Sequence, residues 1–440
     1  MNALTPPLPC HGCGANDLET APAFAAFHRV TSDCKPWPPG GTLARCATCG
    51  LVQTLVTPAW QAEADAIYRD YTIYHQSAGA EQNVFDRSSG QASPRSERII
   101  QALRQALALP EHGRLLDIGC GNGAFLAAWS RLVPGWSLCG SEVSDTHRAR
   151  LEGLPGFERL FTEGLEAIPG PFDVISMIHV LEHVPSPVRY LEQVRARLRP
   201  GGWLLLEVPD CARNPTMLLV ADHCSHFSPP LLAGVAAAAG FEVLEASGEW
   251  VPKEASVLAR VPSVPPPAPS APSPVVVRAS SLHAADTPVV RASSLHAVDT
   301  PVVRASSLHG ADHPVVQASS LHIPPPSPLP SDASKQVFNG WRQLEAILAK
   351  VEPLRHRPNF GLFGTAIAAT WLDAQTSRTA RFFVDEDPNR AGRHHLDRPI
   401  LAPAQVPPDA TVFISLPEPL ATRVAARLHA ANPTVEVVLP

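Results

Sequence analysis

The segment LLDIGCGNGAFL, residues 115–126, decides the fold of this 440-residue chain. Its apolar residues lead into Asp117 and predict a buried strand. The glycines that follow predict a tight turn whose bare backbone lets a ligand approach closely, and Ala124 begins a helix. Doubly wound α/β sheets bind adenosine-containing cofactors at a strand, glycine loop and helix in this order.

Two classes of cofactor fit the glycines alone. The pattern Gly119-x-Gly121-x-x-Ala124 matches the dinucleotide fingerprint, and Glu142 follows near the distance expected for an acid that binds ribose. However, Asp117 stands two residues before the first glycine, where a dinucleotide would place its anionic pyrophosphate. A carboxylate there suits a cationic ligand, such as the ammonium group of a methionine moiety. The loop is therefore predicted to hold S-adenosylmethionine.

Two later segments extend this pattern. FDVISMIHVLEHV, residues 172–184, predicts a second buried strand that runs into a loop, and LRPGGWLLLEVPD, residues 198–210, predicts a turn and a further strand. In this order, the three motifs resemble class I S-adenosylmethionine-dependent methyltransferases over about residues 95–250. The resemblance implies an α/β fold with a Rossmann-like methyltransferase domain.

The resemblance also implies which residues hold the cofactor. Asp117, Gly119 and Gly121 would contact its methionine part. Glu142 would bind the ribose hydroxyls, and His179 would lie beside the cofactor at the end of the fourth strand.

A zinc-binding module is predicted at the N-terminus. CHGCG at residues 10–14 and CATCG at residues 46–50 are two C-x-x-C-G units, each able to wrap one side of a tetrahedral zinc ion. The four ligands would be Cys10, Cys13, Cys46 and Cys49. Four thiolates leave no open coordination position, so the site would be structural. The alternative is a cluster of thiols without metal.

The zinc-knuckle start, the domain order and a C-terminal αβ segment together resemble the sugar C-methyltransferases, which act on nucleotide-linked 4-keto-deoxysugars. In that family a Glu-His pair in an E-H-x-x-Y-F context supplies the base chemistry, and tyrosines from the N-terminal part lie at the substrate. Here the corresponding segment is ADHCSHFS, residues 221–228. Asp222 and His223 match the Glu-His positions, whereas His226 stands where the family has tyrosine.

The chemistry of carbon methylation suits these residues. A proton next to a ketone is poorly acidic, and a histidine that titrates near neutrality is a suitable base. The predicted catalytic residues are therefore His223, Asp222 as its orienting carboxylate, His226, Tyr71 and Tyr74. Structural hydrogen bonding for the first three, and packing of the tyrosine rings, are the alternatives. For the pair Glu182-His183, anchoring of the next helix and contact with a ligand both remain open.

Composition divides the chain into five parts. The predicted parts are a zinc-binding module (1–60), a tyrosine-bearing lead-in (61–94), a methyltransferase domain (95–260), a disordered proline-rich linker (261–334) and a C-terminal Rossmann-like αβ domain (335–440). The linker repeats ASSLH with a period of 13 residues, too poor in apolar residues to build a core. In the last part, Gly361-x-x-Gly364 is not the dinucleotide fingerprint, which favours a scaffold that closes over the substrate. Asp385 and Asp387 are the candidates for ribose contact otherwise.

Charge and cysteine usage limit the function further. The net charge of −6, without a basic stripe, argues against a nucleic-acid partner. Neither a secretory signal nor an apolar run long enough for a membrane span is visible. Nine cysteines without an export signal indicate the reducing cytoplasm. The expected partner is a small-molecule substrate, and the oligomeric state stays open.

The sequence thus predicts a cytoplasmic methyltransferase that uses S-adenosylmethionine and carries structural zinc. Its favoured substrate is a nucleotide-activated keto-sugar or related carbohydrate, methylated on carbon. An O- or N-methyltransferase of another small metabolite is the rival within enzymes. A non-catalytic zinc-dependent interaction module is the alternative of a different class.

Overall fold

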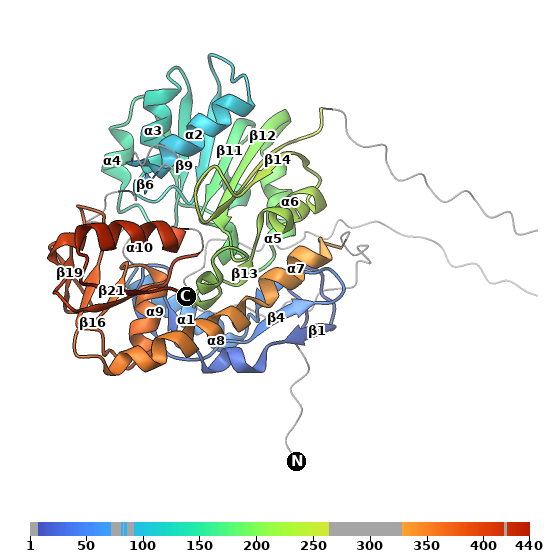
Figure 1. Ribbon diagram of the computed structural model, residues 1–440. Coiled ribbons are helices and arrows are strands. Elements are labelled where there is room, and N and C mark those ends of the chain that lie inside the picture. Colours follow the sequence, from blue (N-terminus) through green and yellow to red (C-terminus); the bar gives the residue numbers. More distant parts are fainter. Residues whose placement is uncertain (1–7, 72–80, 82, 86–91, 264–327, 418–419) are drawn as a thin grey trace, which may run out of the picture.

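The structure is a computed structural model that describes residues 8–71, 81, 83–85, 92–263, 328–417 and 420–440. Tyr74 and the 13-residue repeats lie outside the described residues. The described chain forms three lobes, an N-terminal lobe, a middle lobe and a C-terminal lobe (Figure 1).

A seven-stranded sheet builds the middle lobe, in the order β10-β9-β8-β11-β12-β15-β14. The first five strands and β14 run in one direction, and β15 runs antiparallel between β12 and β14. The strands are β8 (Arg114–Ile118), β9 (Ser137–Ser141), β10 (Phe157–Phe161), β11 (Phe172–Ile178), β12 (Leu198–Pro209), β14 (Glu242–Ser247) and β15 (Glu254–Arg260). The helices are α2 (Arg95–Ala106), α3 (Ala124–Leu132), α4 (Arg148–Glu152), α5 (Pro187–Arg195) and α6 (Pro229–Ala238). The predicted Rossmann-like α/β fold is confirmed.

The glycine loop lies where the strand order of this sheet reverses. The chain runs from β8 to β9 and β10 on one side, then crosses to β11 on the other, and such a switch point opens a crevice at the strand ends. Gly119, Gly121 and Gly123 all have positive φ, so the turn needs residues without a side chain. The loop then starts α3, whose buried Phe125 and Trp129 hold it against the sheet.

A four-stranded sheet builds the N-terminal lobe, in the order β1-β4-β5-β13. Its strands are β1 (Leu18–Thr20), β4 (Leu43–Cys46), β5 (Val52–Thr54) and β13 (Ser225–His226), and the same lobe contains the short pair of β2 (Arg29–Val30) with β3 (Pro36–Trp37). The pair of β6 (Asn83–Phe85) with β7 (Ala92–Pro94) lies instead against the middle lobe (Figure 1). Helix α1 (Pro58–Arg69) follows, and the Thr57 side chain caps its first turn. Because β13 comes from the far end of the middle segment, the N-terminal sheet includes residues from both parts of the chain.

The C-terminal lobe contains a six-stranded sheet in the order β18-β19-β17-β16-β20-β21, parallel except at β18. Its strands are β16 (Phe360–Phe363), β17 (Phe382–Val384), β18 (His394–His395), β19 (Arg398–Leu401), β20 (Thr411–Ile414) and β21 (Glu436–Val438). The helices are α7 (Ser331–Phe338), α8 (Gly340–Val351), α9 (Ile367–Gln375) and α10 (Leu420–Ala431). A second switch point therefore lies between β16 and β20.

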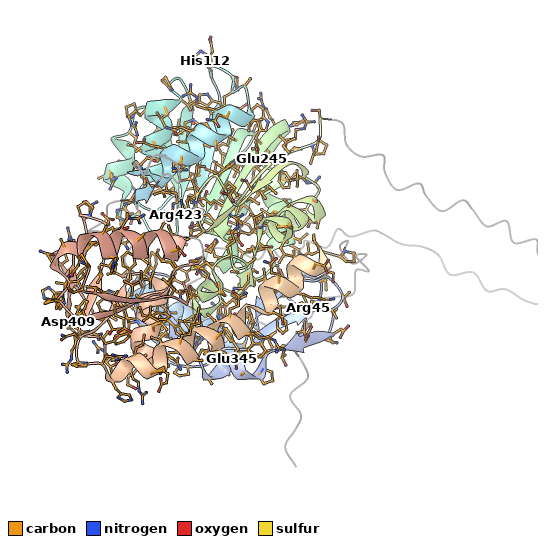
Figure 2. All side chains as sticks on the ribbon, in the orientation of Figure 1. Arg45, His112, Glu245, Glu345, Asp409 and Arg423 are labelled. Carbon is orange, nitrogen blue, oxygen red and sulfur yellow. The ribbon has the colours of Figure 1, made fainter. Side chains whose placement is uncertain are left out.

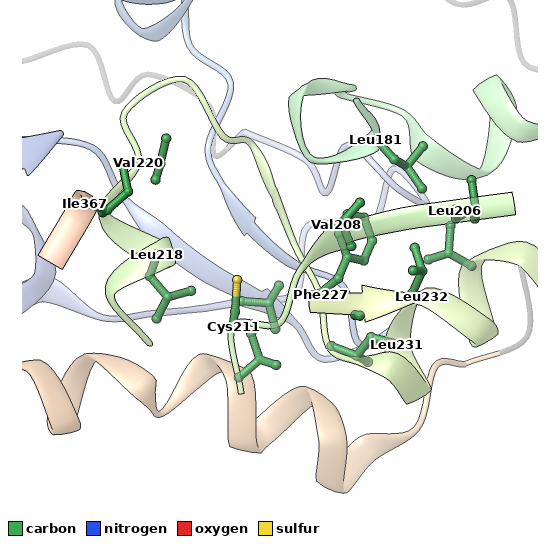
Figure 3. Close-up of a cluster of buried hydrophobic side chains, with 14 of the residues drawn as sticks. Leu181, Leu206, Val208, Cys211, Leu218, Val220, Phe227, Leu231, Leu232 and Ile367 are labelled. Atoms are coloured by element: carbon green, nitrogen blue, oxygen red, sulfur yellow. The ribbon is translucent and has the colours of Figure 1, made fainter. Parts of the chain in front are cut away.

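Buried apolar side chains join the three lobes. One continuous hydrophobic cluster includes Phe24, Leu206 and Phe413, each from a different lobe. Figure 3 shows how the segment after β12 packs into it, with Val220 beside Ile367 of α9. The shared core holds the lobes in a fixed arrangement around the space between them. Among the described residues, no helix combines the length and apolarity that crossing a membrane requires.

Candidate active site

A cavity of about 2970 Å³ lies where the three lobes meet. The glycine loop lines one wall, and Ser32 and Tyr68 of the N-terminal lobe line another. From the C-terminal lobe come residues at the second switch point, such as Thr365 and Asp385, and Arg423 on α10 (Figure 2). The carboxyl ends of both large parallel sheets thus face one space.

Asp117 lies almost fully buried at the mouth of the glycine loop. Its Oδ1 atom accepts a hydrogen bond of 2.7 Å from Ser176 Oγ on the neighbouring strand β11. Burial, with a smaller contribution from the charge of Glu142, raises the pKa of Asp117 to about 7. A cationic ligand in this corner would stabilise the ionised carboxylate.

Glu142 closes the loop from the end of β9. Its carboxylate accepts backbone hydrogen bonds of 2.8 Å from Gly121 and from Val143. The side chain lines the cavity, as do Asp117, Gly119, Gly121 and His179. The five predicted cofactor residues are therefore brought together at one end of the cavity.

His179 follows β11 directly and adopts a positive φ of 56°. Its Nε2 atom lies 2.9 Å from Nη1 of Arg95, the first residue of α2. The Nε atom of Arg95 lies 4.0 Å from Glu207, a fully buried carboxylate whose pKa burial raises to about 8. Sequence reasoning missed Arg95, because only the docking of α2 on the sheet brings it to the cavity.

His223 lines the cavity and is 4% exposed. Its ring meets that of His183 edge to face, with 4.6 Å between centroids. Burial lowers the pKa of His223 well below its usual value, so its imidazole is neutral at neutral pH. The imidazole can therefore accept a proton, but its pKa lies below the near-neutral range that the sequence analysis expected, so burial makes it a weaker base than a free imidazole.

Asp222 contacts other partners than expected. Its Oδ1 atom accepts a hydrogen bond of 2.9 Å from the Ser32 backbone, and its Oδ2 atom accepts one of 2.5 Å from Ser32 Oγ. Oδ2 also lies 3.5 Å from Nδ1 of His183. The carboxylate thus orients Ser32 and His183, and the expected contact with the His223 ring is not among the interactions of the described residues.

His226 lies away from the cavity, contrary to the expectation. Its strand β13 pairs with β5, which carries the side chain into the N-terminal sheet. There it is fully buried, with Nε2 2.9 Å from Thr54 Oγ1. This location gives His226 a structural role.

Two tyrosines of the N-terminal lobe line the cavity. Tyr71 is 40% exposed and lines the cavity. Tyr68, on α1, also lines the cavity, and its hydroxyl lies 2.9 Å from Nδ1 of His183. Sequence analysis did not select Tyr68 as a site residue. Its helical position, one turn before Tyr71, was the signal available.

The four cysteines of the two C-x-x-C-G units meet in one cluster. Cys10 and Cys49 are 3.6 Å apart at sulfur, Cys13 and Cys46 are 3.7 Å apart, and all four sulfurs lie within 4.8 Å of one another. Tetrahedral zinc with Zn–S bonds of about 2.3 Å places its sulfurs about 3.8 Å apart, so the cluster fits the ion. The glycines after each unit have positive φ, as tight knuckle turns require.

The candidate ribose ligands of the C-terminal lobe also face the cavity. Asp385 accepts a hydrogen bond of 3.0 Å from Thr365 Oγ1. Arg390 lies 3.4 Å from Asp385 and 3.8 Å from Asp387, so a cation already balances both carboxylates.

Residues 92–246 match a family model described as a methyltransferase domain. The chain is 31% identical over 157 residues to a ubiquinone biosynthesis O-methyltransferase of Paraburkholderia phymatum, across 31% of this chain and 67% of that protein. The same named enzyme of Bordetella bronchiseptica is 33% identical over 120 residues, across 24% of this chain and 46% of the relative.

Two solved structures align with part of the chain. A Burkholderia thailandensis 1,6-didemethyltoxoflavin-N1-methyltransferase, with S-adenosylhomocysteine bound, has a TM-score of 0.34 and 18% identity, over 50% of this chain and 96% of that one. Mitomycin 7-O-methyltransferase has a TM-score of 0.33 and 23% identity, over 38% of this chain and 53% of that one.

Proposed function

This chain belongs to the class I S-adenosylmethionine-dependent methyltransferases, and we propose that it methylates a carbon atom of a nucleotide-activated keto-sugar or a related carbohydrate. The observation that carries the proposal is the position of His223. Its buried neutral imidazole faces the same cavity as the glycine loop.

Bound S-adenosylmethionine supplies an electrophilic methyl group. In our proposal the loop backbone at Gly119 and Gly121 and the carboxylate of Asp117 hold the methionine part, with Asp117 facing the ammonium group. Glu142 would accept hydrogen bonds from the ribose hydroxyls, and His179 would lie beside the cofactor. The fit rests on the acidic corner at Asp117, which suits a cation, and on the cavity-lining position of every one of these residues.

His223 acts as the general base on the acceptor. A ring nitrogen of His223 takes the proton from the carbon next to the ketone, and the C–H electron pair passes toward the carbonyl oxygen. The enolate carbon is the nucleophilic centre of the acceptor. It would take the methyl group from a cofactor held at the glycine loop, with the electron pair of the S–C bond left on the cofactor sulfur. The neutral state of the imidazole supports this role, because a protonated ring could not accept the proton.

Asp222 is a positioning residue in this scheme. Its carboxylate binds Ser32 and lies close to His183, whose ring packs against His223. Tyr71 and Tyr74 are proposed at the acceptor, and Tyr71 lines the cavity.

The size of the cavity supports an acceptor with a large activating group. Ligand pockets usually measure about 300–1,000 Å³. The volume of about 2970 Å³ leaves room for the cofactor and a second ligand of comparable size. That second ligand would reach from His223 to the C-terminal switch point, where Asp385 and Asp387 are the candidates for ribose contact.

We further propose that the cluster of Cys10, Cys13, Cys46 and Cys49 holds structural zinc. The sulfur separations support this assignment. The ion would fix the knuckle turn at Gly50, whose carbonyl accepts a hydrogen bond of 2.5 Å from Ser334 Oγ of α7. Zinc would thus help to dock the C-terminal lobe.

Methylation of a hydroxyl oxygen is the second candidate. The relatives over the matched region are named O-methyltransferases, and a neutral His223 could equally deprotonate a hydroxyl. Solvent exchange separates the two reactions. With an activated keto-sugar in heavy water, deuterium entering the carbon next to the ketone supports C-methylation. Product methylated at oxygen, without such exchange, contradicts it.

A further inference from the structure

We propose that Glu182, His183 and His223 form a binding site for a divalent transition-metal ion at the wall of the active-site cavity. Only the consequence of this site for catalysis rests on the proposed function. Two imidazole nitrogens and one carboxylate oxygen form a ligand set that suits Mn²⁺, Fe²⁺, Co²⁺ or Zn²⁺ and leaves further coordination positions open.

The ligand atoms already converge. One ligand atom from each of the three residues lies within 4.8 Å of the others. Metal–ligand bonds of about 2.1 Å require separations of roughly 3.0–3.4 Å, so small side-chain rotations would complete the set. All three residues also line the cavity, so the open positions face the acceptor.

The contacts of His183 orient its ring toward the proposed site. Its Nδ1 atom lies 3.0 Å from the backbone carbonyl oxygen of Asp222 and 2.9 Å from the Tyr68 hydroxyl. Because a carbonyl oxygen only accepts, we assign the proton to Nδ1, with the phenol oxygen as a second acceptor, so that Nε2 keeps its lone pair. Metal-binding histidines typically donate their second ring nitrogen to a carbonyl or carboxylate in this way. The carboxylate of Asp222, 3.5 Å away, strengthens that orientation.

Glu182 gives independent evidence for a cation. The residue is 1% exposed, and among the described residues neither carboxylate oxygen has a hydrogen-bond partner. The Nδ1 atom of His179, at 3.4 Å, is close but does not complete a hydrogen bond. A buried carboxylate without partners is costly, and a bound cation would remove that cost.

The proposed site is chemically distinct from the cysteine cluster. The cluster offers four sulfurs in a closed set, whereas this site offers nitrogen and oxygen and stays open. An ion here would occupy the lone pair with which His223 accepts the proton. The ion and the proton therefore compete for His223, and we expect the bound ion to inhibit methyl transfer.

Cobalt titration of the full chain tests the site directly. Co²⁺ is added without acceptor to protein whose cysteine cluster is loaded with zinc, and binding is followed by calorimetry and visible absorption. We expect one ion per chain, with the spectrum of nitrogen and oxygen ligands and no intense thiolate charge-transfer band. H223A and E182Q should each weaken binding at least ~10-fold, as ligand-shell changes do.

His147 provides the matched control, since it also lines the cavity but lies outside the cluster. H147A should bind Co²⁺ as the wild type does. Affinity for S-adenosylhomocysteine shows that each variant is folded. No Co²⁺ binding by the wild type, or wild-type affinity in folded H223A and E182Q, would overturn the site.

The effect of the bound ion on catalysis is measured separately, as turnover. Turnover should fall in proportion to the fraction of sites filled with Co²⁺. Unchanged turnover at full occupancy would overturn the inhibitory role. An acceptor that proves not to be a keto-sugar would overturn the proposed function while the titration result stands.

Discussion

Ser32 donates two hydrogen bonds to the carboxylate of Asp222, from its backbone nitrogen at 2.9 Å and from its hydroxyl at 2.5 Å. The two residues are 190 positions apart in the chain. This pair ties the N-terminal lobe to the segment that carries His223. A residue selected as part of the catalytic machinery therefore holds two lobes together.

Removing the Asp222 carboxylate should lower stability through this pair. Hydrogen bonds to charged groups contribute about 1.5–3 kcal/mol each. D222A should therefore lower the thermal midpoint more than S32A, and the double variant should be little worse than D222A alone. A double-mutant cycle measures the coupling. Fully additive effects would show that the pair contributes nothing.

Asp117 should control the pH dependence of cofactor affinity. Its pKa of about 7 in the free protein means that a cationic cofactor must bind the ionised form. Affinity for S-adenosylmethionine should fall as pH drops below about 7, approaching tenfold per pH unit. Calorimetric titrations from about pH 5.5 to about pH 8.5, on either side of this pKa, measure the affinity. D117A should abolish binding, and D332N, on α7 and outside the cavity lining, should behave as the wild type.

The raised pKa of Asp117 also makes the free energy of unfolding depend on pH. The folded pKa of Asp117 lies above the unfolded value of about 3.9, so the folded state binds more protons between them. The contribution to the free energy of unfolding is fully present below about pH 4 and is lost as pH rises through about 7. In D117N this component should vanish, which thermal midpoints across that range would reveal. An identical profile in both proteins would contradict the assignment.

His223 and His226 form a matched pair for testing the base. H223A should keep cofactor affinity and lose at least ~100-fold in turnover, because general-base catalysis contributes about that much or more. H226A should lower the thermal midpoint, since it breaks the buried contact with Thr54, yet retain turnover in the folded fraction. Turnover with labelled cofactor measures both. Equal losses in the two variants would remove His223 as the base.

Loss of zinc from the cysteine cluster should lower turnover, because the N-terminal sheet connects the cluster to the segment around His223. Chelation, or C46A, should release one ion per chain and unfold the knuckle turns, since a structural site contributes on the order of 10 kcal/mol. Because β13 pairs with β5, the segment around His223 should loosen as well. Metal analysis and turnover measure the two effects. C139A, a buried cysteine outside the cluster, is the control; equal metal content in both variants would contradict the assignment.

The features predicted from sequence depend on local patterns. The glycine loop needs positive φ at fixed positions, and the cysteine units need a fixed spacing, so both are visible in short segments. His226 and Asp222 were misjudged because their partners, Thr54 and Ser32, come from the other end of the chain. The pattern of residues 221–228 contains no signal that predicts the pairing of β13 with β5.

The cavity could not be predicted for the same reason. It exists because three lobes from different parts of the chain share one core and bring two sheet switch points to one space. Arg95 and Tyr68 reach that space from helices whose docking is a tertiary property. For Glu182 and His183 the sequence left helix anchoring and ligand contact both open, because their convergence with His223 depends on a loop some 40 residues later.

The position of the transferred methyl group tests the proposed methylation on carbon most directly. The full-length protein is incubated with S-adenosylmethionine carrying a ¹³C-methyl group and with a panel of nucleotide-activated 4-keto-deoxysugars, and the products are examined by carbon NMR. We predict a new signal from a methyl group that is bonded to a ring carbon next to the carbonyl, and we predict that this signal is absent with H223A. A methyl group bonded to oxygen or nitrogen, or an unchanged carbon signal in H223A, would contradict this prediction.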